Sequence, residues 1–88
     1  MQNSRHLAIT ALKSNPLVIF THEQLAQLAD PEFDIRLAEL GMDSLGYMEL
    51  SIWLEIELGM TIPLSEIEKI STLKALASLI DAQLESKK

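Results

Sequence analysis

The chain has 88 residues, which is enough for one small domain and too few for two independent hydrophobic cores. It carries 7 Lys and Arg against 13 Asp and Glu, a formal charge of −6, and this argues against nucleic-acid binding because phosphate recognition needs a cationic surface. Hydrophobic residues make up 48% of the sequence, so we expect an ordered fold. Because cysteine is absent, disulfides, thiolate metal sites and cysteine nucleophiles are excluded.

No segment of the sequence is typical of a targeting peptide or a membrane span. Lys13 closes the apolar stretch over residues 7–12 too soon for a signal peptide, and no A-x-A-like cleavage site follows. The longest uninterrupted aliphatic and aromatic run, residues 17–20, is far too short to cross a bilayer. We therefore expect a monomeric cytoplasmic protein, free-standing, with no membrane partner and with one domain over residues 1–88.

The first third of the chain predicts two short helices joined by an apolar loop. Apolar residues recur at helical spacing from Asn3 or Ser4 to Ser14, where Asn15-Pro16 ends the pattern. Residues 17–20 favour a strand but have no second strand to pair with, so we expect them to anchor a loop. A capping Thr three residues before a Gln then opens a short helix over residues 21–29.

The segment from Asp43 to Gly59 is the most strongly predicted helix. Asp43 or Ser44 can cap its start, no proline interrupts it, and Gly59 stands where a helix commonly ends in a left-handed residue. At about 100° per residue, the apolar residues of this helix fall on two faces. The face expected toward the core has bulky members: Tyr47, Leu50, Leu54 and Leu58.

Two more helices are expected after this one. The residues Ile62-Pro63-Leu64 break the chain, and the capping box at residues 65–68 opens a short helix with Ser65 as its cap. Ser71 or Thr72 then caps a last helix, whose apolar residues recur with a helical period up to Leu84. The expected fold class is all-α, a small bundle of about four helices, three longer and one short, with a long first loop.

The second apolar face of the main helix consists of Leu45, Met48, Ile52 and Ile56, which we call the outer stripe. Either it meets solvent or a partner, or residues 17–20 and Phe33 cover it. Charge favours a partner, since no Lys or Arg lies between Arg36 and Lys69 while seven of the thirteen acidic residues do. An acidic helix with an apolar stripe is suited to a basic partner surface, although it can also be a solvated acidic face.

The hexapeptide Leu40-Gly41-Met42-Asp43-Ser44-Leu45 resembles the Leu-Gly-x-Asp-Ser-Leu signature of acyl carrier proteins. The resemblance continues at family-like spacing through residues 48–50, 54–55, Gly59, 62–63 and 66–70. It covers residues 33–80 well and the preceding region only loosely. Taken alone, Asp-Ser at a helix start would be an ordinary N-cap, and the wider pattern favours the family.

The resemblance implies that Ser44 carries 4′-phosphopantetheine, attached from coenzyme A by a phosphopantetheinyl transferase with Mg²⁺, and that Asp43 and Leu45 flank the attachment site. An acyl or aminoacyl group is then held as a thioester on the terminal thiol, which fits a chain without cysteine. Independently of the family, the unpaired N–H groups and positive dipole end of a helix N-terminus stabilise a phosphodiester.

Implied partners are the transferase, an acyl- or aminoacyl-loading enzyme and a ketosynthase or other condensing enzyme. We expect them to dock on the main helix, with acids as rim and the outer stripe as centre; the partner-binding residues are Met48, Glu49, Ile52, Glu55 and Ile56. Neither catalytic residues nor a metal site are expected in the chain, since its two histidines, His6 and His22, are not spaced as ligands.

Departures from the family pattern favour a specialised pathway. Gly46 stands where carriers of fatty acid synthesis usually have an acid, so we expect a less charged and more flexible first turn. Met42 replaces the second Gly typical of peptidyl carriers, and the first loop is longer than usual. We expect polyketide or hybrid polyketide/peptide biosynthesis, with an aminoacyl or peptidyl carrier and a fatty acid synthesis carrier as alternatives. A helical adaptor without any modification is the alternative from another class. The bulky core face predicts a short or polar cargo displayed near Ser44.

Overall fold

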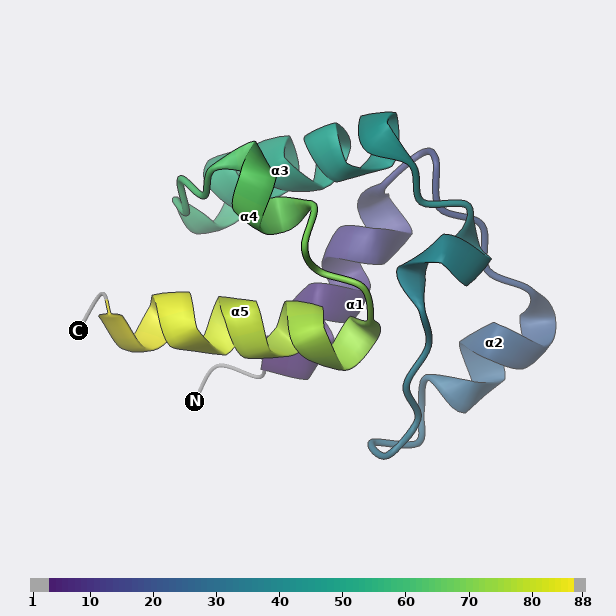
Figure 1. The fold of residues 1–88 in the computed structure, drawn as a ribbon. Coiled ribbons are helices and arrows are strands. Elements are labelled where there is room, and N and C mark those ends of the chain that lie inside the picture. Colours follow the sequence, from purple (N-terminus) through teal and green to yellow (C-terminus); the bar gives the residue numbers. More distant parts are fainter. Residues whose placement is uncertain (1–3, 87–88) are drawn as a thin grey trace.

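The computed structural model describes residues 4–86, and within this range it contains five α-helices, one 3₁₀ helix and no strand (Figure 1). In chain order the elements are α1 (Ser4–Ser14), α2 (His22–Gln27), η1 (Leu37–Leu40), α3 (Ser44–Leu58), α4 (Leu64–Ile67) and α5 (Leu73–Ser86). The prediction of an all-α bundle with three longer helices is confirmed. The expected helix after Thr21 is α2, which lies within the long first loop. The described residues thus include two short α-helices, α2 and α4. Asn3, the alternative start of the first helix, lies outside the described residues.

The body of the molecule is the packing of α1 against α5, with α3 and α4 across them (Figure 1). Both α1 and α5 bury one apolar stripe at helical spacing and leave the other face to solvent. The buried members are Ala8, Ala11 and Leu12 in α1, and Leu73, Leu76 and Ile80 in α5. On the surface, Ser4 Oγ donates a hydrogen bond to Asp81 Oδ1 at 2.9 Å and joins the two helices again.

Helix α3 lies with its predicted core face inward. Leu50 and Leu54 are fully buried, while Tyr47 and Leu58 are half-buried and packed against the same core. The helix ends at Gly59, whose φ of 66° is left-handed and whose N–H donates to the Glu55 carbonyl at 3.1 Å. Because this conformation is strained for other residues, Gly59 sets the length of α3.

A short antiparallel pairing joins the segment before η1 to the start of α5. The Leu37 N–H donates to the Ser71 carbonyl at 2.8 Å, and the Leu73 N–H donates to the Ile35 carbonyl at 3.0 Å. These bonds flank an isolated bridge and fix where η1 lies relative to α5. They satisfy buried backbone groups in the segments between the helices, as strand pairing does in a sheet.

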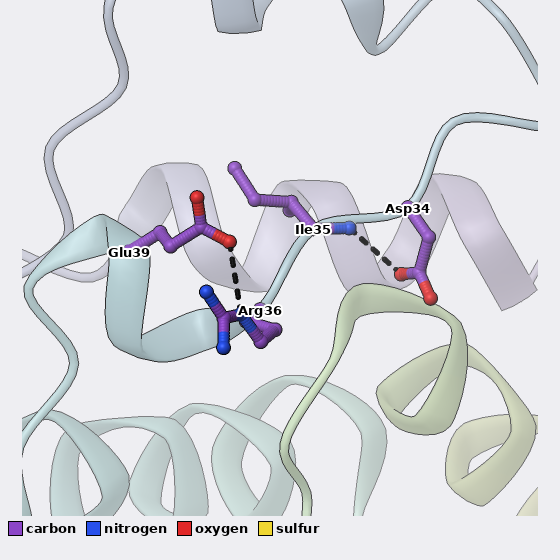
Figure 2. A network of polar contacts seen from close by, with 4 residues as sticks. All are labelled: Asp34, Ile35, Arg36 and Glu39. Carbon is purple, nitrogen blue, oxygen red and sulfur yellow. Dashed lines mark hydrogen bonds and ion pairs between the residues drawn. The ribbon is translucent and has the colours of Figure 1, made fainter.

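Asp34 caps α5 from outside that helix. Its Oδ1 accepts hydrogen bonds from the N–H groups of Ile35 and Lys74, both at 2.9 Å, and Figure 2 shows the first of these contacts. Two residues further along, Arg36 Nε pairs with Glu39 Oε2 at 3.2 Å on the exposed side of η1 (Figure 2). An exposed pair of this kind contributes at most about 1 kcal/mol, so the cap matters more than the ion pair.

Of the caps expected for α2, α4 and α5, two are confirmed and one is wrong. The capping box of α2 is confirmed, since Thr21 Oγ1 accepts from the Gln24 N–H and the Gln24 side chain accepts from the Thr21 N–H. Thr72 caps α5 as expected, because its Oγ1 accepts from the Ala75 N–H at 3.1 Å. The Ser65 cap is wrong: α4 starts at Leu64, two residues before the start that a Ser65 cap implies, which places Ser65 inside the helix where it cannot cap.

Tyr47 joins α3 to the segment that leads into α5. Its hydroxyl donates a hydrogen bond of 2.6 Å to the Ile70 carbonyl. Burial of the phenol, and secondarily the negative charge of Glu68, raise the pKa of Tyr47 above its ordinary value of 10.0. A neutral phenol is also the form that can donate this hydrogen bond.

We therefore expect the phenol of Tyr47, the only tyrosine in the chain, to ionise above pH 10.0 in the folded protein. The contribution of the neutral Tyr47 phenol to the free energy of unfolding is fully present below the unfolded-state pKa of this group. It is lost as pH rises through the higher folded-state pKa. A tyrosinate absorbance titration gives the midpoint directly, and Glu68→Gln should move it toward 10.0 while Glu32→Gln leaves it in place. A wild-type midpoint at or below that of the urea-unfolded chain contradicts the assignment.

Candidate functional site

Ser44 is the first residue of α3, and its side chain is exposed. Asp43 precedes it in extended conformation and caps the helix, its Oδ1 accepting from the Gly46 N–H at 3.0 Å. The Asp43 carbonyl accepts the first regular helical bond, from the Tyr47 N–H at 2.9 Å. The expected cap is thus Asp43, and the Ser44 hydroxyl is left accessible for chemistry. Leu45, the next residue, is also exposed.

The turn leading to Ser44 is held from two sides. From the first loop, the Ile19 N–H donates to the Leu40 carbonyl at 3.0 Å. Within the turn itself, the Met42 N–H donates to the Leu37 carbonyl at 3.3 Å, and Gly41 takes a left-handed φ of 84°. Only a residue without Cβ adopts this conformation readily, so Gly41 permits the sharp change of direction between η1 and α3.

Asn15 is the buried polar residue that connects the first loop to this turn. Its Nδ2 donates to the Gly46 carbonyl at 2.9 Å, and its Oδ1 accepts from the Leu17 N–H at 3.0 Å. Both ends of the amide are therefore used, as burial of a polar side chain requires. In the sequence Asn15 indicates only the end of α1, because nothing in the pattern shows that it contacts a residue 31 positions away.

Gly46, expected to make the first turn of α3 less charged and more flexible, is closely packed in the structure. Gly46 is buried, and a Cβ placed on it would lie 2.5 Å from Met42 Sδ. The thioether of Met42, itself buried, occupies the space that a side chain at position 46 would need. The absence of a side chain at Gly46 therefore leaves room for Met42 in the first turn of α3. Met42 and Gly46, the two departures from the family pattern, thus pack against each other.

The start of α3 has the donors that a phosphodiester requires. The Gly46 and Tyr47 N–H groups are used by Asp43, whereas those of Ser44 and Leu45 have no acceptor among residues 4–86. Free N–H groups at the positive end of a 15-residue helix stabilise an anion bonded to a side chain there. Together with the exposed hydroxyl, they fit a phosphate ester on Ser44.

The outer stripe is exposed on α3. Its members Leu45, Met48, Ile52 and Ile56 are between 46% and 72% accessible. The alternative that residues 17–20 and Phe33 cover it is wrong, because Val18, Phe20 and Phe33 pack against the core. Four exposed large apolar side chains on one helix form an apolar surface of the kind that marks a contact site.

The acidic residues of α3 lie on either side of this stripe. Glu49, Glu55 and Glu57 are exposed, and none has an ion pair or a side-chain hydrogen bond within the part of the chain that the structure describes. Their charges are therefore available to an approaching cation, since no internal partner neutralises them.

A groove of about 140 Å³ runs between α1 and α3, which the sequence did not predict. Its α3 side is formed by Glu49, Trp53 and Glu57 with the edge of the outer stripe. The opposite side is formed by Ala11, Ser14 and Asn15. The sequence places Glu49, Trp53 and Glu57 four residues apart and hence on one face, but the opposite wall depends on how α1 packs. Trp53 is partly exposed.

A family model described as the phosphopantetheine attachment site matches residues 21–80. The chain belongs to this family. The matched range begins just before α2 and ends within α5, so it includes η1, the turn with the Leu40–Leu45 signature and the whole of α3. Members of the family carry a covalent 4′-phosphopantetheine group. Comparison with curated proteins and with solved structures gave no significant match.

Within residues 4–86 no group of three or more His, Asp or Glu is placed to hold a metal ion. No helix in the same range is long and apolar enough to cross a membrane.

The contact between Met42 and Gly46 predicts a stability coupling. Gly46→Ala should cost more stability in the wild-type background than in Met42→Ala, where the new methyl group has room, and we expect a coupling of about 1 kcal/mol. Urea unfolding of the two single variants and the double variant gives the coupling. Additive effects would contradict the contact. Ser51→Ala combined with Met42→Ala is the control pair and should be additive.

Proposed function

We propose that this protein is a non-catalytic carrier on which Ser44 bears the 4′-phosphopantetheine group. The observation that carries the proposal is the exposed Ser44 hydroxyl at the N-terminus of α3, inside the range matched by the family. The terminal thiol of that group holds acyl or aminoacyl chains as thioesters while partner enzymes act on them.

The residues of the chain have separate tasks in this function. Ser44 provides the nucleophilic oxygen, and the free N–H groups of Ser44 and Leu45 stabilise the negative charge of the resulting phosphodiester. Asp43 holds the first turn through Oδ1, and its Oδ2 has no hydrogen bond among the described residues. This second oxygen is suited to a cation, such as the Mg²⁺ that the transferase brings.

The surface of α3 is proposed as the docking site for partners. Exposed apolar side chains at Met48, Ile52 and Ile56 supply a centre, and Glu49 and Glu55 supply a charged rim. This arrangement recruits basic partners quickly and releases them, as a carrier with successive partners requires. Proposed partners are the transferase, a loading enzyme and a ketosynthase or other condensing enzyme.

We further propose a specialised polyketide or hybrid polyketide/peptide pathway and a short or polar cargo displayed near Ser44. The packing below α3 supports the second point, since Leu50, Leu54 and Ile67 are completely buried. A long acyl chain could enter only by separating these side chains. A core of this size would then lose much of the packing that stabilises it.

Replacing Ser44 should abolish the modification. Incubation with coenzyme A, Mg²⁺ and a promiscuous transferase should add one phosphopantetheine group to the wild type and none to Ser44→Ala, as measured by mass spectrometry of the intact protein. Ser65→Ala is the matched control, an exposed serine near the start of another helix, and should be modified fully. Modification of Ser44→Ala would refute the attachment site. An unmodified wild type would favour the adaptor that binds partners without a prosthetic group.

Charge reversal on α3 should slow partner association. Glu49→Lys or Glu55→Lys should lower the association rate with the transferase several-fold and flatten its salt dependence, with little change in stability because both residues are exposed. Stopped-flow binding at two ionic strengths measures both effects. Glu32→Lys, an equal charge change between α2 and η1, is the control. Equal rates for all three variants would contradict the surface.

A further inference from the structure

The groove between α1 and α3 has a composition that the carrier function does not require. Glu49, Trp53 and Glu57 follow one another at intervals of four residues along α3, so the indole lies between two carboxylates. Ala11 and Ser14 of α1 and the following Asn15 form the other side, and Ile52 and Ile56 form the apolar edge. The groove lies beside the outer stripe, on the flank of α3 that faces α1.

The size of the groove limits its occupant. Its volume of about 140 Å³ is well below the roughly 300 Å³ at which pockets for small-molecule ligands begin. It can take one side chain of a protein that lies on the neighbouring surface of α3. A docked partner would thus use the outer stripe for area and the groove for one inserted residue.

The charge of the groove limits its chemistry. An apolar side chain placed between Glu49 and Glu57 would remove two carboxylates from water without offering a hydrogen bond, which is unfavourable. A cation pairs with the carboxylates and is attracted to the face of an indole. Lys13, an exposed cation on α1, does not line the groove, and neither does any other basic residue among residues 4–86.

We infer that this groove receives an arginine side chain from a basic partner that docks on α3. The aliphatic stem packs against Ile52 and Ile56, and the planar guanidinium stacks on Trp53 with its N–H groups directed to Glu49 and Glu57. Lysine has the charge but lacks the planar group and the five donors, so arginine is preferred. The inference deepens the proposed carrier function and rests on it for the identity of the partner, but the groove itself does not depend on Ser44.

The test uses the full chain and four blocked pentapeptides, acetyl-Ala-Leu-Xaa-Leu-Ala-amide, in which Xaa is arginine, citrulline, lysine or leucine. Citrulline is the control because it keeps the shape of arginine without the charge. Trp53 is the only tryptophan, so its indole N–H gives a single resonance in an NMR titration at fixed ionic strength. We expect saturable movement of this resonance by the arginine peptide and binding about fivefold or more weaker for citrulline and leucine.

Variants locate the bound arginine. Glu49→Gln and Glu57→Gln should each weaken the arginine peptide about two- to fivefold, whereas Glu55→Gln, which removes one charge from α3 outside the groove, should have a smaller effect. Equal binding of the arginine and citrulline peptides, equal or tighter binding of lysine, or the largest shifts away from residues 49–57 would each overturn the inference.

The Ser44→Ala variant separates this inference from the carrier proposal. It should bind the arginine peptide as the wild type does, since Ser44 does not line the groove. Peptide binding by a chain that no transferase modifies would leave the groove assignment in place and refute the carrier function. A modified chain whose Trp53 resonance ignores the arginine peptide would leave the carrier function and refute the groove assignment.

Discussion

The two hydrogen bonds of the Asn15 amide hold together the parts of the molecule on which the site depends. They join the end of α1 and the beginning of the first loop to the first turn of α3, which lies 31 residues further along the chain. A buried amide satisfied at both ends is costly to disturb, because losing either partner leaves a polar atom without water. Ser44 therefore starts from a rigid turn, and its exposed hydroxyl does not depend on loop order for its position. Asn15 also lines the groove between α1 and α3.

The helices and their inner faces could be predicted from the sequence because local periodicity and capping residues agree with the final packing. Leu50 and Leu54 are buried as the spacing requires, and Gly59 ends α3 as its position indicates. Ser65 shows the limit of such local signals. A capping box can be recognised from four residues, but helix α4 begins at Leu64, directly after Pro63 and two residues before the start that the capping box indicates.

The interior of the site could not be predicted in the same way because it depends on side-chain packing and on contacts between residues far apart in sequence. In the sequence, Gly46 indicates a flexible helix turn. In the structure, the Met42 thioether fills the space that a side chain at Gly46 would occupy. The groove wall formed by α1 is set by the packing of α1 on α5, which no spacing within α3 reveals. By contrast, Ser44, Asp43 and the outer stripe lie within one helix and its cap, and their placement follows from the sequence.

Helix α2 has a consequence for how the chain opens. Figure 1 shows it outside the bundle of the three long helices, and none of its six residues is buried. Its capping box stabilises only its own first turn, and Leu28, just beyond the helix, is the nearby side chain that enters the core. A helix this short is marginal alone, and its unfolding exposes little apolar surface. Amide hydrogens in α2 thus exchange through local opening, whereas those of Leu50 and Leu54 wait for global unfolding. The chain has two levels of protection, with Ser44 at the edge of the more stable one.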